Sequence, residues 1–155
     1  MCKLALLLSL LAAPLAFAAT ASADQPQTAT IPISFSVVDT GACGSSLPIT
    51  TSGTGEIRIT TFADGRQIRH FDVDITLSAG AKTVTTSQSN TVFVDGTTRT
   101  IVGAAWTINV PGQGALVLDA GRLVLGPRGD VLFEAGPHEM FHHDVAALCA
   151  YLSSS

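Results

Sequence analysis

Three histidines and a glutamate lie close together near the end of the chain, in the run His138-Glu139-Met140-Phe141-His142-His143. On a helix, histidines four residues apart share one face and can hold Zn²⁺ while the glutamate activates the bound water. The context does not favour this chemistry. The run follows Gly136-Pro137, the best helix start comes only at Asp144, and Asp144 is too close to supply a third ligand. We therefore predict a solvated connector without stoichiometric metal.

Two metal-dependent alternatives remain open for the same residues. One is a zinc-dependent hydrolase in which His138 and His142 bind the metal and Glu139 acts as the base. The other is incidental metal binding by His138, His142 and His143.

A second candidate for chemistry is Arg69, because it alternates with the apolar residues Phe71 and Val73. An inward-facing arginine needs a carboxylate partner, since a buried unpaired charge costs several kcal/mol. Asp119 is a conceivable partner, and the pair would then bind an anionic or polar ligand. If the register is shifted by one residue, both are surface residues, and we favour this second interpretation.

The elements that would position these residues are strands. From Ile31 to Ala135 the chain is rich in Thr, Val and Ile and is interrupted by turn signals, which is typical of an antiparallel meander. Asp64-Gly65 and Asp95-Gly96 indicate two-residue type I′ hairpins. Further reversals are expected at four places, which divides the region into about eight strands. These are Gly80, 87–90, 111–114 and 126–129.

Alternation of apolar and polar residues predicts which side chains face inward. One inward row is expected to contain Val102, Ala104, Trp106, Ile108 and Val110. Strands with one buried and one solvent-exposed face fit a closed antiparallel sheet. We therefore predict an all-β, up-and-down antiparallel barrel, with a two-sheet sandwich as the alternative. The predicted interior comprises Phe35, Phe71, Val73, Ile75, Trp106 and Ile108.

The period changes to that of a helix at the end of the chain, where Val145, Leu148, Cys149 and Leu152 follow Asp144. Asp144 is a good N-cap residue. We expect a short C-terminal helix that packs on the barrel.

The beginning of the chain predicts export. An apolar run from Leu4 to Ala19 ends in Ala21-Ser22-Ala23, the pattern of a cleavable signal peptide over residues 1–23. We expect a flexible N-terminus over residues 24–30 and one domain over 31–155. Once residues 1–23 are removed, seven basic and twelve acidic residues leave a net charge of −5. This charge disfavours nucleic acid and anionic membranes as partners.

Cysteine usage agrees with export, because Cys2 is removed with the signal peptide and only Cys43 and Cys149 remain. A pair of cysteines in an oxidising compartment predicts a disulfide. Cys149 lies on the apolar face of the expected helix, so a bond to Cys43 would attach the helix to the loop after the first strand.

Four segments of the mature chain resemble those of small secreted actinobacterial proteins of unknown function, which have a Cys-x-x-Pro-like start, an Ala-Gly-Arg strand and a Leu-Cys-Ala end. The segments are Cys43–Ile49, Phe62–Arg66, Asp119–Leu123 and Leu148–Leu152. The resemblance implies export, a compact β fold and the terminal disulfide, but no activity. The expected strand count is also similar to that of allene oxide cyclase and dirigent barrels, which is a likeness of fold alone.

These observations predict a secreted, non-enzymatic protein that binds a small apolar ligand or an extracellular partner and needs no cofactor. A barrel of about eight strands has room for one small ligand. The expected ligand-binding residues are Phe35, Arg69, Phe71, Val73, Trp106 and Asp119. A zinc-dependent hydrolase and a cyclase-like barrel enzyme are the alternatives.

Overall fold

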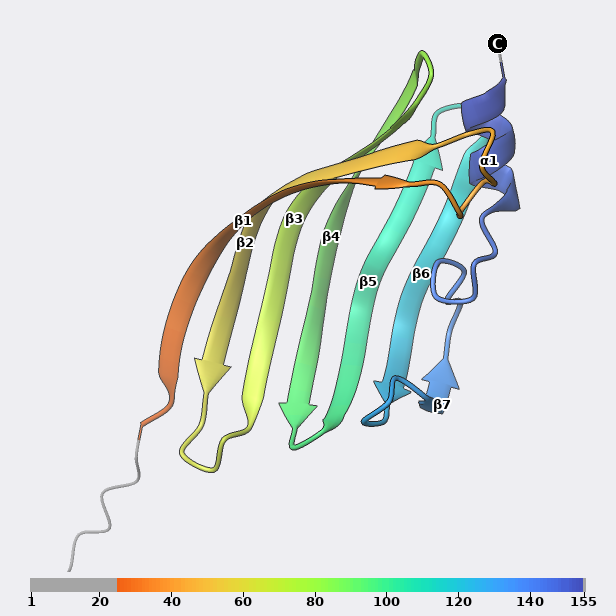
Figure 1. Ribbon diagram of the computed structural model, residues 1–155. Coiled ribbons are helices and arrows are strands. Elements are labelled where there is room, and N and C mark those ends of the chain that lie inside the picture. The colour runs from red at the N-terminus through yellow and green to blue at the C-terminus, as the bar shows by residue number, and fades with distance from the viewer. Residues whose placement is uncertain (1–24, 155) are drawn as a thin grey trace, which may run out of the picture.

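The computed structural model describes residues 25–154, so the expected signal peptide lies outside the described part of the chain. The described residues form seven antiparallel strands and one short helix (Figure 1). The first strand begins at Gln27, earlier than the expected start at Ile31. The elements are β1 (Gln27–Asp39), β2 (Ile49–Thr61), β3 (Gln67–Ala79), β4 (Lys82–Asp95), β5 (Thr98–Val110), β6 (Gly114–Leu125), β7 (Val131–Ala135) and α1 (Ala146–Ser153).

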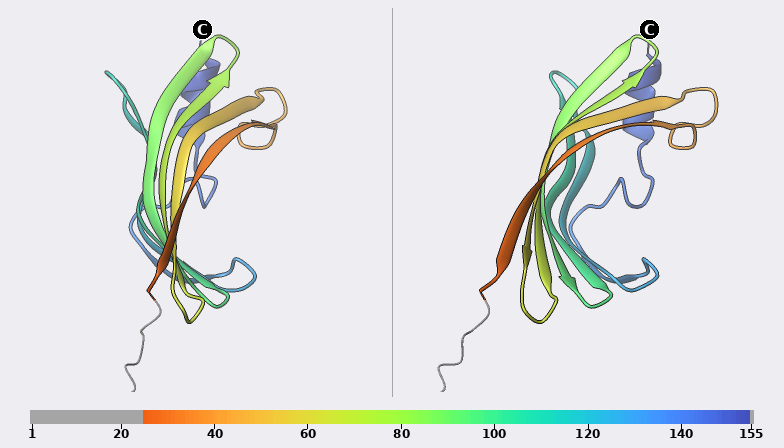
Figure 2. Two further views of the ribbon diagram at one scale, coloured as in Figure 1. Left: turned by 90° about the vertical axis from the view of Figure 1, so that its left-hand side faces the viewer. Right: turned by 60° about the vertical axis from the view of Figure 1, so that its left-hand side comes forward.

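The strands form one sheet in sequence order, each paired with the next. The expected all-β, up-and-down topology with a C-terminal helix is therefore confirmed. The expected barrel is wrong, because within residues 25–154 no pairing joins β1 to β7, and there is no second sheet to make a sandwich. Closure needs long first and last strands, whereas β7 has only five residues. The sheet is instead strongly curved, and α1 lies against its concave face (Figure 2).

The reversal expected at residues 87–90 does not exist, because β4 runs without interruption from Lys82 to Asp95. The two-residue turns that favour hairpins need a residue with positive φ, and none of these four has one. This stretch is polar but extended, since its backbone pairs with β3 on one side and, from Ser89 onward, with β5 on the other. The loss of this turn accounts for seven strands where about eight were expected.

The hairpins at Asp64-Gly65 and Asp95-Gly96 occur where predicted, but they are not type I′ turns. Only the glycines have positive φ, +84° at Gly65 and +56° at Gly96, and the aspartates do not. Between β2 and β3, the Phe62 N–H donates to the Arg66 carbonyl and the Gly65 N–H donates to the Phe62 carbonyl. One residue with positive φ is enough for such a turn.

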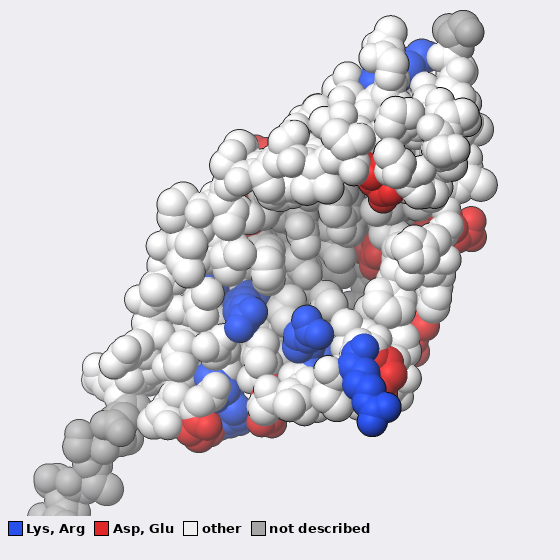
Figure 3. Space-filling model, in the orientation of Figure 1, with Lys and Arg blue, Asp and Glu red and all other residues white. Residues whose placement is uncertain are grey.

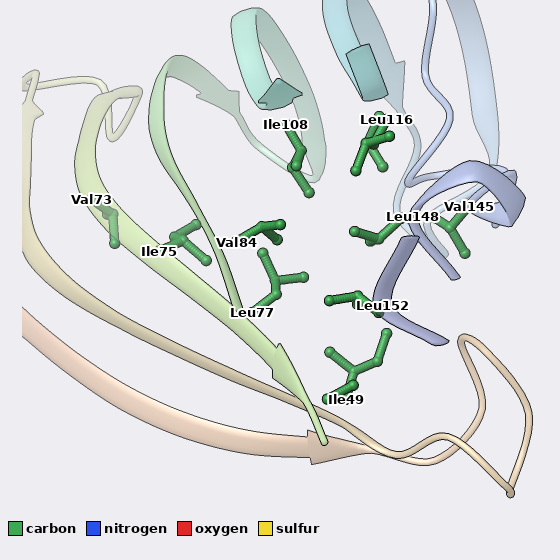
Figure 4. Packing of buried hydrophobic residues seen from close by; sticks show 12 residues of the cluster. Ile49, Val73, Ile75, Leu77, Val84, Ile108, Leu116, Val145, Leu148 and Leu152 are labelled. Atoms are coloured by element: carbon green, nitrogen blue, oxygen red, sulfur yellow. The ribbon is translucent and has the colours of Figure 1, made fainter. Parts of the chain in front are cut away.

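The hydrophobic core lies between α1 and one end of the concave face (Figure 4). Val73, Ile75 and Leu77 alternate along β3 and are almost completely buried, as the strand parity predicted. Leu148 and Leu152 of α1 cover them from the other side. The remaining buried members of this core are Ile49, Ala79, Val84, Ile108, Leu116, Val117 and Val145.

The apolar spacing of the helix is confirmed, but its expected cap is wrong. The N-cap position is Val145, and no side chain of the described part of the chain caps the helix. Asp144 comes one residue before the N-cap position. Its backbone N–H donates to the Glu139 carbonyl, which holds Asp144 in the preceding turn.

The predicted disulfide is confirmed. Cys43, in the connection between β1 and β2, is bonded to Cys149 of α1 with a Cα–Cα distance of 5.4 Å. On another side of the helix, the Lys82 ammonium lies 5.1 Å from the centre of the Tyr151 ring. The helix is thus attached to the sheet by a covalent bond as well as by its apolar contacts.

Candidate functional site

Beside the helix-covered core, the concave face contains a cavity of about 330 Å³, which we call the central cavity. Figure 3 shows that this face is hollowed at its middle, with basic side chains gathered along its lower rim. The volume lies in the range of small-molecule sites, roughly 300–1,000 Å³. Its apolar side chains are Ile101, Ala105, Trp106, Leu123, Met140 and Phe141, and its polar ones are Gln88, Asn90, Asp119 and His138.

A β-bulge builds one wall of the central cavity. Ala104 pairs with Ala120 and Trp106 pairs with Asp119, so Ala105 is the extra, unpaired residue in β5. A bulge reverses the parity of a strand. Before it, the odd residue Ile101 faces the cavity, and after it the even residue Trp106 does so.

The same bulge corrects the inward row predicted for β5. Val102 lies on the opposite, convex face, where it lines a depression with Arg58, His70 and Asp72. Ala104 is exposed. The predicted row is therefore right only from Trp106 onward, because a strict period of two does not allow for the extra residue.

A buried carboxylate and imidazole form the polar centre of the wall. Asp119 of β6 forms an isolated bridge with His138, which follows β7. His138 Nδ1 lies 2.9 Å from Asp119 Oδ1, and the side chains are only 4% and 9% exposed. A carboxylate can only accept, so Nδ1 carries a proton, and when the imidazole is neutral Nε2 is an acceptor.

His138 Nε2 is buried and has no hydrogen-bond partner among the described residues. An unsatisfied buried polar atom costs about 1–3 kcal/mol, so it calls for a structural or functional reason. It belongs to a side chain that lines a cavity, where a bound molecule can supply the missing partner.

The polar stretch of β4 contributes the opposite wall. Gln88 and Asn90 share the cavity-facing parity, and the Gln88 Nε2 amide donates to Asn90 Oδ1 at 3.1 Å. Asn90 is only 7% exposed. The residues that sequence analysis assigned to a turn are thus part of the candidate site.

The histidine run near the end of the chain forms turns, not a helix, so its four-residue spacing does not bring the side chains together. His138 faces Asp119, whereas Glu139 Oε2 accepts the Leu118 N–H at 2.7 Å. His142 Nε2 lies 2.8 Å from Glu134 Oε1. Over residues 25–154 no group of three or more His, Cys, Asp or Glu side chains is arranged to hold a metal ion.

Of the six ligand-binding residues predicted from the sequence, only Trp106 and Asp119 meet in the central cavity. Val73 is in the core, and Phe71 packs against it. Phe35 is in β1, away from the cavity, and its ring packs against the backbone of Gly53 in β2. All six lie on the concave side of the sheet by register, but an open sheet does not bring them together.

The suggested pairing of Arg69 with Asp119 is wrong, and the favoured surface position is also wrong for Asp119, which is 6% exposed. The Arg69 guanidinium donates to Gln67 Oε1 from both Nε and Nη2, at 3.0 and 2.7 Å. Asp119 is already bonded to His138. Sequence reasoning missed this partner, although the alternation of Asp119 with buried Val117 and Leu123 indicates an inward carboxylate that needs one.

The chain matches no family model, no curated protein and no solved structure. None of the helices in residues 25–154 has the length and apolar character needed to cross a membrane.

Proposed function

We propose that the protein binds a small, largely apolar molecule carrying one hydrogen-bond donor, such as a hydroxyl group, in the central cavity. The observation that carries this proposal is the composition of the wall. Apolar side chains from two strands and the segment after β7 surround a buried imidazole with a free acceptor. Binding sites for small molecules typically combine a mostly apolar lining with a few polar groups that fix orientation.

The chemistry of the polar centre supports recognition more than covalent catalysis. Asp119 orients the His138 ring and leaves Nε2 to accept a hydrogen bond from the ligand. Among the described residues, the side chains that line the cavity include no serine, threonine, cysteine or lysine to act as a nucleophile.

A ligand can reach His138 Nε2 only if part of the cavity wall moves, because this atom is covered by protein atoms. The neighbouring segment is suited to this. Met140 is half-buried and Phe141 is exposed, and both belong to turns rather than to the sheet. Methionine is unbranched and adapts its shape readily.

The proposal includes export, and the protein would act outside the cell. The disulfide between Cys43 and Cys149 supports this, since such bonds persist in oxidising compartments. Protein recovered from the medium of a secreting host is expected to begin at Asp24, which N-terminal sequencing reports. Retention of the intact chain within the cell would contradict export.

Trp106, the only tryptophan of the chain, lies in the cavity wall and reports binding directly. Titration with 1-octanol is expected to shift its emission in a saturable manner. Heptyl methyl ether has similar size but no donor. It is expected to bind about two- to tenfold more weakly, since one hydrogen bond contributes roughly 0.5–1.5 kcal/mol.

A matched pair of variants distinguishes the cavity from nonspecific partitioning. Ala105→Leu fills the cavity from the bulge and is expected to abolish the octanol response. Ala104→Leu adds the same side chain at the neighbouring exposed position and is expected to preserve it. An unsaturable response, or equal responses in both variants, would contradict the proposal.

A further inference from the structure

The two edges of the open sheet differ, and β1 is the longer one, with 13 residues against five in β7. The hydrogen-bond pattern shows which residues of β1 have free backbone groups. The Phe62 N–H bonds to the Arg66 carbonyl, so even residues of β2 face β3 and odd residues face β1. The register of β1 with β2 has no shift, so odd residues of β1 are paired and even residues point to the free edge.

Pro32 agrees with this assignment. It is an even residue, and proline on an edge strand is tolerated where its missing N–H would face outward. Among residues 25–154, nothing pairs with the N–H and C=O groups of Ser34, Ser36 and Val38 on this edge, beyond the point that Pro32 protects.

This second half of β1 has few of the features that normally protect an edge strand. Proteins use charges, prolines, bulges or very short strands for that purpose, and between Pro32 and Asp39 β1 contains no charged residue. Its apolar side chains are exposed, with Phe35 38%, Val37 58% and Val38 60% accessible. β7 is short, and the side chain of its Glu134 bonds to His142 of the following segment.

We propose that a second copy of this chain pairs with β1 through residues 34–38, antiparallel and about a two-fold axis at Ser36. In this register Ser34 exchanges both backbone hydrogen bonds with Val38 of the second copy, and Ser36 exchanges them with its own counterpart. No bond requires the missing N–H of Pro32.

The second copy suits this edge because the segment is complementary to itself. The two-fold register places Phe35 opposite Val37 of the other copy on the concave side, and aromatic and β-branched pairs of this kind stabilise sheets. A two-fold contact is closed, so it makes a dimer and not a fibre. An acidic or basic partner strand would find no charge in this segment to pair with.

Sedimentation of the exported protein over a range of concentrations tests the proposal. The native chain is expected to have twice the monomer mass at high concentration and to dissociate on dilution. Ser36→Pro removes an outward N–H without touching the bonds to β2, as Pro32 already does naturally. This variant is expected to remain a monomer at every concentration, with an unchanged circular dichroism spectrum.

Thr28→Pro is the matched control, because Thr28 has the same outward parity but lies outside the paired segment. It is expected to dimerise like the native chain. A native chain that stays monomeric at all concentrations would overturn the proposal. So would a folded Ser36→Pro variant that still dimerises, or loss of the dimer in folded Thr28→Pro.

Discussion

The two parts of the concave face show how one sheet can hold both a core and a cavity. At one end, Val73, Ile75 and Leu77 present branched side chains to α1, and the space between them is filled. At the middle of the face, Gly103 and Gly121 pair across β5 and β6 and present no side chain. The cavity exists where large side chains are missing and polar residues replace apolar ones on the same concave face.

Removing the disulfide that attaches α1 to the sheet is expected to reduce stability the most. The double variant Cys43→Ser/Cys149→Ser opens a connection between residues 106 apart in the sequence. The chain-entropy model gives a loss of about 4–5 kcal/mol for such a loop. We expect a markedly lower melting temperature, measured by calorimetry against the native protein under the same conditions. An unchanged melting temperature would show that α1 is held by packing alone.

Shortening a buried side chain of α1 is expected to reduce stability somewhat less. Leu148 is 1% exposed and faces the core from α1, so Leu148→Ala is expected to destabilise the fold by about 2–5 kcal/mol. Ala147→Ser changes an exposed neighbour on the same helix and is expected to have little effect. Urea unfolding of both variants measures the difference. Equal midpoints would contradict the assigned packing face of the helix.

Substitutions in the wall of the central cavity are expected to reduce stability less than those in the core. Asp119→Ala leaves the buried His138 ring without its acceptor, which should cost about 1–3 kcal/mol. Asp119→Asn keeps an acceptor oxygen at the same place and is expected to lose less. The same urea unfolding experiment compares them. If the asparagine variant were as unstable as the alanine variant, charge and not the hydrogen bond would explain the pairing.

The smallest effect concerns Asp39, at the start of the connection that carries Cys43. The N–H groups of Gly41 and Ala42 donate to its carboxylate at 2.6 and 3.1 Å and lower the pKa of Asp39 below its usual 3.8. A lowered folded pKa means that the contribution to stability is present above pH 3.8 and is lost as the pH falls through the lowered value. Asp39→Asn is expected to remove this small part of the acid dependence.

Unfolding midpoints at neutral and acidic pH measure this effect. Asp64 is the counterpart at the β2–β3 hairpin, where the Arg66 backbone and guanidinium lower the pKa of the carboxyl. Asp64→Asn should reduce the acid dependence in the same direction. A native protein whose stability does not change between these conditions would contradict both assignments.

Much of the sheet could be predicted from the sequence, because strand parity depends on neighbouring residues. The alternation along β3 and the spacing of Leu148 and Leu152 both appear in the structure as predicted. The cysteine pair was also predictable, since Cys43 and Cys149 are the two cysteines outside the expected signal peptide. These features require no knowledge of how distant strands meet.

The candidate site could not be assembled in this way. The bulge at Ala105 leaves no signature in a run of small residues, yet it determines that Trp106 faces the cavity. The contact of Asp119 with His138 depends on the chain after β7 returning along β6. Barrel closure depends on the length of β7 and on the curvature of the whole sheet, neither of which is encoded in a local pattern.

The central claim is that the middle of the concave face binds a small molecule while the helix-covered end does not. Nuclear magnetic resonance of the isotopically labelled protein during titration with 1-octanol tests it most directly. We predict saturable shifts at Ile101, Ala105 and Leu123, with the resonances of Ile49 and Leu77 unchanged. Shifts centred on the helix-covered core, or no saturable shift at all, would contradict the account.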